Sequence, residues 1–309
     1  MSIAAIDCGT NSIRLLIADV DEAGILHEQM RVMRIVRLGE GVDRTGEFSA
    51  GALQRTFAAC DEYAALIAAA GVDGVRFVAT SATRDVRNRQ QFVSGVRARL
   101  GVDPDVISGD EEAVLSFTGA VRGLLTGLVK LPALIVDIGG GSTEFVLGSV
   151  NPTHSVSVNI GCVRMAERHL HGDPATQEQI AAVEADLALA LDLVRDAVPI
   201  AQAASIVGLA GSVTTVAAMA FDLGEYDPVL LHGSTITAEQ VEAVTARLLA
   251  MTKAERAALP FMHPGRVDVI GAGAMVLRAI VRASGIDEVL VSETDILDGI
   301  VYTLTSNKG

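Results

Sequence analysis

The clearest feature of the chain is an apolar run that is broken by a short polar loop and then resumes at once, and this pattern occurs twice. Residues 3–17 read IAAIDCGTNSIRLLI, and residues 133–147 read ALIVDIGGGSTEFVL. Short apolar runs bounded by glycine-containing turns are typical of buried strands, so each segment predicts a hairpin. Three positions recur at one offset (137 − 7 = 130), with Asp7, Gly9 and Ser12 matching Asp137, Gly139 and Ser142. Two matching hairpins at a constant offset indicate a duplicated domain.

The rest of the chain alternates between short apolar runs and longer amphipathic stretches, which is typical of an α/β fold. Further strands are expected over residues 25–36, 75–79, 105–107, 156–161, 206–208 and 288–292. Helices are expected over residues 50–70, 88–100, 108–125, 174–197, 237–251, 266–284 and 295–305, and a further helix is expected to follow the segment 209–215 and to run through residue 221. With the passage between halves placed at 123–131, the predicted domains are 1–125 and 126–298, and the terminal helix 299–309 is a candidate addition to the first domain.

Length and charge narrow the function classes. A chain of 309 residues suggests about two domains. The formal net charge of −14 argues against nonspecific binding to nucleic acid or to a membrane surface. We find neither an uninterrupted apolar run of about 18 residues, as a membrane span needs, nor a secretory signal. Three scattered cysteines (Cys8, Cys60 and Cys162) without a CxxC pair predict a reduced, cytoplasmic protein, and Cys8 is interpreted as a packing residue under its turn.

The second hairpin loop carries candidate chemistry. Gly139, Gly140 and Gly141 lack a Cβ atom, so a ligand can approach the backbone closely and successive N–H groups can form an anion site. The carboxylates of Asp137 and Glu144 bracket this loop and would repel a bare phosphate. They fit a phosphate site if a divalent cation lies between them and the phosphate oxygens. An ordinary tight turn is the alternative interpretation.

Three other segments are candidates for the same site. Arg84 follows a strand at the edge where α/β sheets bind ligands, so it either holds a phosphate or forms a salt bridge to Asp85 or another carboxylate. Glu112 lies at a helix start, where it either faces a reacting water or only balances the helix dipole. Gly211 and Ser212 form a turn that enters a helix N-terminus, which is an anion site in its own right.

These motifs together resemble the exopolyphosphatase/guanosine pentaphosphate phosphatase (Ppx/GppA) family, in its short two-domain form, within the actin-like ATPase superfamily. The resemblance covers nearly the whole chain. It rests on DCGTNSIRL (7–15), ATSATRDVRN (79–88), ISGDEEA (107–113), DIGGGSTE (137–144), GLAGSVTTVAAM (208–219) and VSETDILDG (291–299). Two departures from the family pattern are mild: Cys8 replaces an aliphatic residue, and Ser212 replaces a threonine.

The resemblance implies two ribonuclease-H-like domains with the active-site cleft between them. It also implies that Glu112 is the general base, that Arg84 holds substrate phosphate, and that Asp7, Asp137 and Glu144 bind Mg²⁺, for which Mn²⁺ can substitute. The phosphate-binding residues would be Gly9, Thr10, Asn11, Ser12, Arg84, Gly139, Gly140, Gly141, Ser142, Gly211 and Ser212. Subunit pairing into a homodimer is plausible from the family.

The expected activity is hydrolysis of the terminal phosphate of inorganic polyphosphate, with pppGpp as the alternative substrate. The chain contains no tryptophan, and we find no aromatic-rich stretch near the loops that would stack on guanine. A sugar or carboxylate kinase and a nucleotide-gated binding protein are rival interpretations from other classes. Release of free phosphate without any acceptor distinguishes the hydrolase from both.

Overall fold

The computed structural model describes residues 2–84, 86–124 and 127–306. Its contacts divide the chain into two compact units, which we describe separately. Unit 1 contains Met1–Gly119 and Ile296–Gly309, and unit 2 contains Ala120–Asp295. The chain thus passes into unit 2 before the expected segment 123–131 and returns to unit 1 at Ile296, the first residue of its last helix.

Unit 1 contains a five-stranded sheet in the order β3-β2-β1-β4-β5. An antiparallel meander is formed by β1 (Ser2–Cys8), β2 (Ser12–Val20) and β3 (Leu26–Ile35). Two parallel strands, β4 (Gly74–Ala79) and β5 (Asp105–Val106), extend the sheet beyond β1. The hairpin and the strands expected in this part of the sequence are confirmed.

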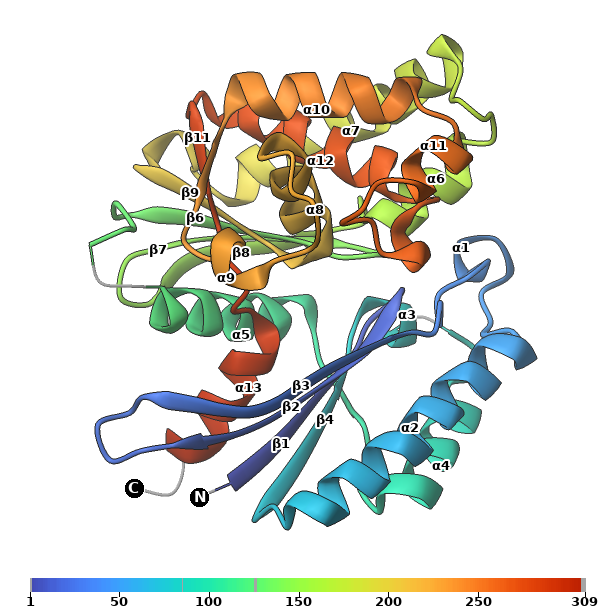
Figure 1. Ribbon diagram of the computed structural model, residues 1–309, viewed down its shortest axis with the longest axis vertical. Coiled ribbons are helices and arrows are strands. Elements are labelled where there is room, and N and C mark those ends of the chain that lie inside the picture. Colours follow the sequence, from blue (N-terminus) through green and yellow to red (C-terminus); the bar gives the residue numbers. More distant parts are fainter. Residues whose placement is uncertain (1, 85, 125–126, 307–309) are drawn as a thin grey trace. The chain divides into compact units, whose positions relative to one another are not determined.

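Helices cover both faces of this sheet. On one face α2 (Ala50–Ala70) packs against α4 (Arg89–Leu100). On the opposite face α13 (Ile296–Ser306) packs on β1 and β2 (Figure 1). Successive side chains of a strand point to opposite faces. Accordingly, Ala4 and Ile6 belong to the core with α2 and α4, whereas Ile3 and Ala5 belong to the core with α13.

The ends of these helices follow the expected sequence signals. Ser49 caps α2 by accepting a hydrogen bond from the Ala52 amide, and Gly71 ends the helix in the left-handed conformation. The unit also contains the short helices α1 (Val42–Thr45) and α3 (Ser81–Arg84). The first part of α5 (Gly109–Gly123) belongs to it as well, and this helix continues into unit 2.

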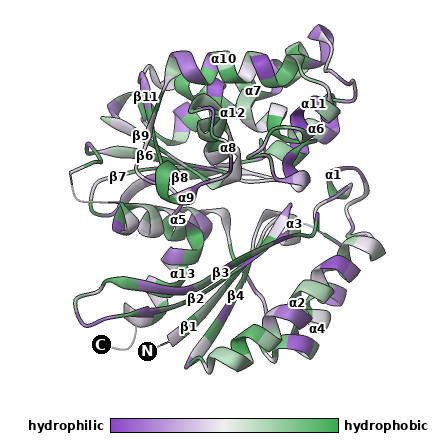
Figure 2. Cartoon of the chain, in the orientation of Figure 1, coloured by the Kyte–Doolittle hydropathy of each residue, from purple (hydrophilic) through white to green (hydrophobic). Residues whose placement is uncertain are grey.

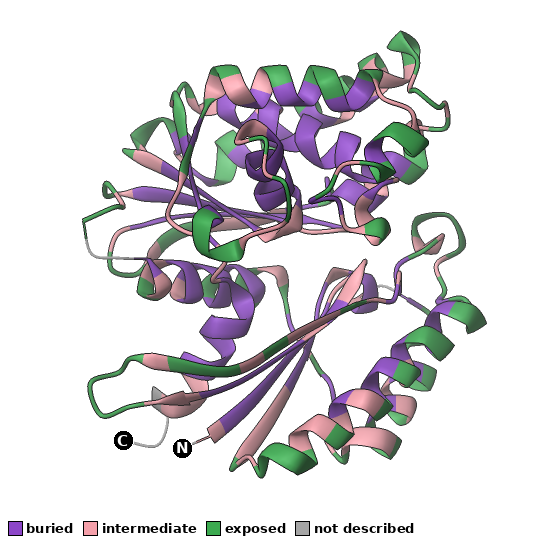
Figure 3. Cartoon of the chain, viewed as in Figure 1, coloured by how far each residue is buried: buried purple, intermediate pink, exposed green. Residues whose placement is uncertain are grey.

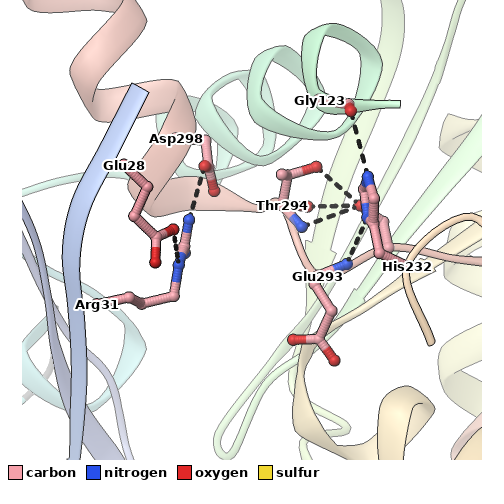
Figure 4. Close-up of polar contacts among 8 residues, drawn as sticks. Glu28, Arg31, Gly123, His232, Glu293, Thr294 and Asp298 are labelled. Carbon is pink, nitrogen blue, oxygen red and sulfur yellow. Dashed lines mark hydrogen bonds and ion pairs between the residues drawn. The ribbon is translucent and has the colours of Figure 1, made fainter. Parts of the chain in front are cut away.

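An ion pair joins the terminal helix to the edge of the sheet. Arg31 on β3 donates to Asp298 on α13 and to Glu28, each at 2.8 Å (Figure 4). Asp298 is almost fully buried. Because a buried carboxylate is costly without a partner, this contact favours the inclusion of α13 in unit 1.

Unit 2 contains a six-stranded sheet in the order β10-β11-β9-β6-β7-β8. Its meander is β6 (Ala133–Ile138), β7 (Thr143–Gly148) and β8 (Pro152–Val158), and its parallel strands are β9 (Ser205–Leu209) and β11 (Glu288–Val291), with β10 (Thr235–Thr237) at the edge. The order β8-β7-β6-β9-β11 repeats the order of unit 1. The duplication predicted from the two hairpins is therefore confirmed in the sheet topology.

The helices of unit 2 build one large core. They are α6 (Cys162–His169), α7 (Gln177–Ala197), α8 (Ala210–Ala220), α9 (Pro228–Leu231), α10 (Ala238–Ala250), α11 (Lys253–Ala257) and α12 (Ile270–Ser284), with short 3₁₀ turns at Ile200–Gln202 and Pro264–Arg266. Figure 2 shows hydrophilic residues along α10, and Figure 3 shows that α12 and α8 are largely buried. In the described part of the chain, no helix combines the length and apolarity that a membrane crossing requires.

The sequence pattern did not predict α6, α9 or α11, and α8 begins earlier than expected, at Ala210. The helix expected from residue 174 begins at Gln177, because Thr176 and Gln179 form a capping box. The helix expected from residue 266 begins at Ile270, because the Pro264–Arg266 segment forms a separate 3₁₀ turn.

Candidate active site

The carboxyl ends of three parallel strands bring the predicted residues of unit 1 to one sheet edge. Cys8 lies opposite Ala79, and Ala79 lies opposite Val106. The segments that follow these strands, residues 9–12, 80–84 and 107–112, therefore start side by side. The hydroxyls of Thr10 and Ser81 lie 3.0 Å apart and link two of the segments. This edge is where α/β sheets bind ligands.

Asp7 forms an ion pair across the hairpin. Arg14 lies directly opposite Asp7 in the antiparallel register, and it donates to Oδ2 of Asp7 from Nε at 3.0 Å and from Nη2 at 2.7 Å. The Asp7 side chain is buried. Sequence reasoning treated Asp7 as a metal ligand and did not notice Arg14, which engages one of the two carboxylate oxygens.

The first loop holds its peptide groups in a defined orientation. The Gly9 amide donates to the Ser12 carbonyl and closes the turn. The carbonyls of Thr10 and Asn11 accept hydrogen bonds from amides of residues 36–39. Since the C=O and N–H of a trans peptide point in opposite directions, the amides of Asn11 and Ser12 are directed away from that segment. They are the loop's candidate donors to an anion.

Glu112 and Arg84 meet at the same edge. Glu112 lies in the first turn of α5, and its Oε2 accepts from Nη1 of Arg84 at 2.7 Å. The Glu112 side chain is 10% exposed and that of Arg84 is 21% exposed, so both remain reachable by a small ligand. The salt bridge that the sequence left open as an alternative for Arg84 is thus present, and its partner is Glu112.

Unit 2 repeats this arrangement. Asp137 near the end of β6 lies opposite Leu209 on β9, and Gly208 lies opposite Val291 on β11. The segments that follow, residues 139–142, 210–212 and 292–295, therefore begin at one sheet edge. They contain the glycine loop and the Gly211–Ser212 turn that the sequence singled out.

The glycine loop rests on the N-terminus of α6. Each glycine carbonyl accepts from a backbone amide of this region: Gly139 from Cys162 (2.9 Å), Gly140 from Val163 (2.9 Å) and Arg164 (3.1 Å), and Gly141 from Gly161 (3.3 Å). A Cβ atom on Gly161 would lie 2.3 Å from the Gly140 carbonyl. The loop and the helix start are therefore in contact that only a glycine at position 161 allows.

This contact directs the loop amides. Because the three glycine carbonyls point at α6, the N–H groups in the same peptide planes, those of Gly140, Gly141 and Ser142, point away from it. Three successive amides directed to one side form a concave anion site. The geometry thus favours the phosphate-loop interpretation over that of an ordinary tight turn.

Two carboxylates flank the loop as a cross-strand pair. Asp137 and Glu144 are register partners on β6 and β7, and both are buried. Oε1 of Glu144 accepts from the hydroxyls of Ser142 at 2.6 Å and Ser157 at 2.7 Å, which fixes the orientation of the carboxylate. No group of three or more His, Cys, Asp or Glu residues able to hold a metal occurs among the described residues.

The donor set nevertheless fits Mg²⁺. This ion is usually bound through one or two carboxylates together with water and substrate phosphates, so an acidic pair beside a phosphate loop is sufficient. Asp137 and Glu144 supply the hard oxygen ligands that such an ion prefers.

At the Gly211–Ser212 turn, the guanidinium group of Arg266 lies where the sequence predicted an anion site. Ala210, which opens α8, has a φ of 66°, and a Cβ atom on Gly211 would lie 2.2 Å from Cζ of Arg266. Nη1 of Arg266 lies 3.2 Å from Oγ1 of Thr215, which itself donates to the Gly211 carbonyl at 2.6 Å. Arg266 therefore lies against the helix start. Ser212 is buried beside Gly273, where a Cβ atom would lie 2.3 Å from Oγ of Ser212, so the absence of a side chain at position 273 lets α8 and α12 pack closely.

Burial is the main influence on the pKa of two thiols near these loops, those of Cys162 and Cys8. Burial raises the pKa of Cys162, and the hydrogen bond with Ser212 and the charge of Arg266 oppose that effect only in part. Cys8 is fully buried under its loop, and burial raises the pKa of its thiol well above the usual range. The packing role predicted for Cys8 is confirmed.

Sequence reasoning missed three contributors: Arg14, Arg266 and the α6 start at Gly161. A signal for Arg14 was present, because the offset of 130 that relates the hairpins places it at the position of Glu144. The cleft expected between the two domains stays a prediction.

Comparisons with known proteins identify the family and the fold of this chain. Residues 16–308 match the model of the Ppx/GppA phosphatase family. The chain is 47% identical to Exopolyphosphatase 2 of Mycobacterium tuberculosis over 98% of both sequences. A crystal structure of an exopolyphosphatase-like protein superposes with a TM-score of 0.95 at 42% identity, covering 99% of each chain. The Aquifex aeolicus Ppx/GppA family member superposes with a TM-score of 0.82 at 27% identity, covering 100% of this chain and 99% of that one. The expected two-domain, actin-like α/β fold is therefore confirmed, and the chain belongs to the Ppx/GppA phosphatase family.

Proposed function

We propose that this protein is an exopolyphosphatase, which hydrolyses the terminal phosphoanhydride bond of inorganic polyphosphate and releases orthophosphate. The main support is the glycine loop, whose three amides point to one side next to a buried acidic pair. Family membership and the name of the Mycobacterium tuberculosis relative support the same activity. We further propose that residues of both units act on one substrate molecule, as the family resemblance implies.

The substrate phosphates are proposed to bind to amides, hydroxyls and guanidinium groups. In unit 2 the donors are the loop amides and the Gly211–Ser212 turn with Arg266 beside it. In unit 1 they are the Gly9–Ser12 loop and Arg84. Multiple fixed donors stabilise the charge that spreads over the phosphoryl oxygens during transfer.

Glu112 is the proposed general base. Its carboxylate orients a water molecule for in-line attack on the terminal phosphorus and accepts the proton of that water as the new P–O bond forms. The bond to the remaining polyphosphate breaks, and the shortened chain leaves with the bonding electron pair. Arg84, at 2.7 Å from Glu112, holds the carboxylate in place and supplies positive charge next to the reacting group.

Asp137 and Glu144 are the proposed ligands of a divalent cation, with Asp7 in a supporting role because Arg14 engages one of its oxygens. When bound, Mg²⁺ would neutralise charge on the phosphate oxygens. The hydroxyls of Ser142 and Ser157 keep Glu144 in one orientation for this purpose.

Inorganic polyphosphate is favoured over pppGpp because each proposed donor recognises phosphate. The chain has no tryptophan, and none of the proposed donors recognises a guanine base. The three buried cysteines are free, which is typical of proteins from a reducing compartment, so we propose a cytoplasmic location.

Release of orthophosphate from tripolyphosphate, measured without any phosphate acceptor, tests this proposal. We expect release with Mg²⁺ or Mn²⁺, loss of release in excess chelator, and recovery when the ion is restored. Phosphate transfer that depends on an added acceptor would identify a kinase, and binding without turnover would identify a nucleotide-gated binding protein. Full activity in excess chelator would contradict the roles of Asp137 and Glu144.

A further inference from the structure

The chain passes between the units through two crossing segments, residues 120–124 and 292–297. These segments contact each other within unit 2. The first segment leaves α5 at Gly123, and the second runs through Glu293 and Thr294 just before α13. A Cβ atom on Gly123 would lie 2.1 Å from Oγ1 of Thr294, so the Gly123 backbone and the Thr294 side chain are in close contact. Hydrogen bonds between Thr294 and the Ser292 hydroxyl fix the shape of the second segment.

His232 bridges the same two segments. Its Nε2 lies 3.2 Å from the Gly123 carbonyl, and its Nδ1 lies 3.2 Å from the Glu293 amide (Figure 4). Because a backbone amide only donates and a carbonyl only accepts, Nδ1 accepts and Nε2 carries the proton. The imidazole therefore joins the end of α5 to the segment before α13 through two directional bonds.

A second set of hydrogen bonds extends from Glu293 to α8. The Tyr226 hydroxyl lies 2.6 Å from Oε1 of Glu293 and 2.7 Å from Oγ1 of Thr214. Burial and the neighbouring Glu293 charge raise the pKa of Tyr226 well above its usual range. The phenol thus keeps its proton, and its hydroxyl links the Glu293 carboxylate to the Thr214 hydroxyl.

Thr214 belongs to the first turns of the helix that carries the third anion loop. The next residue, Thr215, donates to the Gly211 carbonyl at 2.6 Å and lies 3.2 Å from Arg266. Adjacent residues of α8 therefore contact the proposed phosphate donors on one side and the hydrogen-bonded series on the other. The hydrogen bonds of the series are partly buried, and connected networks of this kind hold their members in one arrangement.

We propose that the series Thr214–Tyr226–Glu293–His232 couples phosphate binding at the start of α8 to the two crossing segments. Tyr226 and His232 are positioning residues in this scheme. When phosphate binds to Gly211 and Arg266, the hydrogen-bonded series restrains the crossing segments at Gly123 and Thr294. The inference rests on the proposed function only in taking the start of α8 as a phosphate site.

Hydrogen exchange of the full chain tests the coupling. In the wild type, tripolyphosphate is expected to slow amide exchange both at residues 210–215 and at the crossing segments 120–124 and 292–297. In Tyr226→Phe, protection at residues 210–215 is expected to remain, whereas protection of the crossing segments is lost. With tripolyphosphate as substrate, we expect kcat to fall about tenfold and KM to change less than about twofold.

Two further variants separate coupling from general loss of stability. Thr245→Val removes another buried hydroxyl of unit 2, on α10. In this variant, tripolyphosphate should protect both residues 210–215 and the crossing segments from exchange, as in the wild type. His232→Gln, whose amide can still donate to the Gly123 carbonyl, should retain more of the ligand-induced protection and more kcat than His232→Ala. Equal effects of the glutamine and alanine variants would contradict the bridging role of the imidazole.

The outcomes are independent of the proposed activity. If wild-type protein binds tripolyphosphate but does not hydrolyse it, the proposed function fails, and the exchange measurement still decides the coupling. Inorganic phosphate serves as a second probe. The inference is overturned if neither anion protects the crossing segments of the wild type, or if Tyr226→Phe transmits protection as fully as the wild type.

Discussion

Replacement of Gly161 by alanine tests the contact that directs the loop amides. Position 161 precedes α6 with φ −75° and ψ 158°, a conformation that alanine adopts without strain. The substitution therefore leaves the local backbone preference intact and adds one methyl group. That methyl would lie 2.3 Å from the Gly140 carbonyl and 2.4 Å from the Gly141 nitrogen.

The size of the effect follows from this overlap. Ordinary van der Waals contact begins at 3.4 Å, so the loop or the helix start must move by about 1 Å. Overpacking of this kind costs about 1–3 kcal/mol of stability. A misplacement of about 1 Å in groups that position a substrate lowers the rate on the order of 10²-fold. We expect Gly161→Ala to fold and to lose kcat/KM by about this factor.

Phosphate release from tripolyphosphate measures the loss, and chemical denaturation measures the stability. Gly224→Ala is the matched control, because no atom lies within 4 Å of the Cβ position of Gly224. A folded Gly161→Ala variant with kcat/KM within about threefold of both the wild type and this control would refute the argument, since the rate loss derives from the displacement.

Two more predictions follow from the site. Glu112→Gln should keep the fold and tripolyphosphate binding but lose phosphate release by about 10²–10⁴-fold. Glu111 is a half-exposed neighbour paired with Arg76, so Glu111→Gln should retain phosphate release. Comparable rates for the two variants would reduce Glu112 to a helix-dipole residue. Burial, and then the charge of Arg266, lower the pKa of His263. Its stabilising contribution is therefore complete above the ordinary histidine pKa of about 6.5 and declines as the pH falls below it. Urea unfolding at pH 7.5 and 5.5 should show a smaller acid-induced loss for His263→Asn, and an unchanged loss would contradict this assignment.

The duplicated hairpins were predictable because their chemistry is local. Apolar strands, an aspartate and glycines lie within 15 residues, so one offset identified both copies. The same comparison contained Arg14, which replaces Glu144 in the first copy. The recurring residues do not indicate this contact, whereas the residue that differs between the two copies explains why Asp7 forms an ion pair.

The start of α6 was not predictable by the same means. The helix has eight residues, which is too short for a strong periodic signal. No side chain caps it, because the glycine carbonyls of a loop some 20 residues earlier accept its first amide hydrogens. The contact becomes visible only when β6 and β7 have placed that loop.

The partners of the candidate charges also depended on tertiary structure. Arg84 and Glu112 are 28 residues apart, and the sequence left a phosphate site and a salt bridge equally open for Arg84. The parallel pairing of β1, β4 and β5 places them at one edge. Arg266 was missed for the same reason, because its contact with Gly211 arises from the packing of separate elements.

The most direct test of the account is the ratio of kcat/KM for tripolyphosphate to that for pppGpp, measured at matched terminal-phosphate concentrations with Mg²⁺. The proposed site recognises phosphate through amides, guanidinium groups and a cation. We therefore predict that tripolyphosphate and short polyphosphates are hydrolysed more efficiently than pppGpp, and that both activities fall together in Glu112→Gln. Turnover of pppGpp far above that of every polyphosphate would contradict the account, because it would require a guanine-binding site that the described donors do not provide.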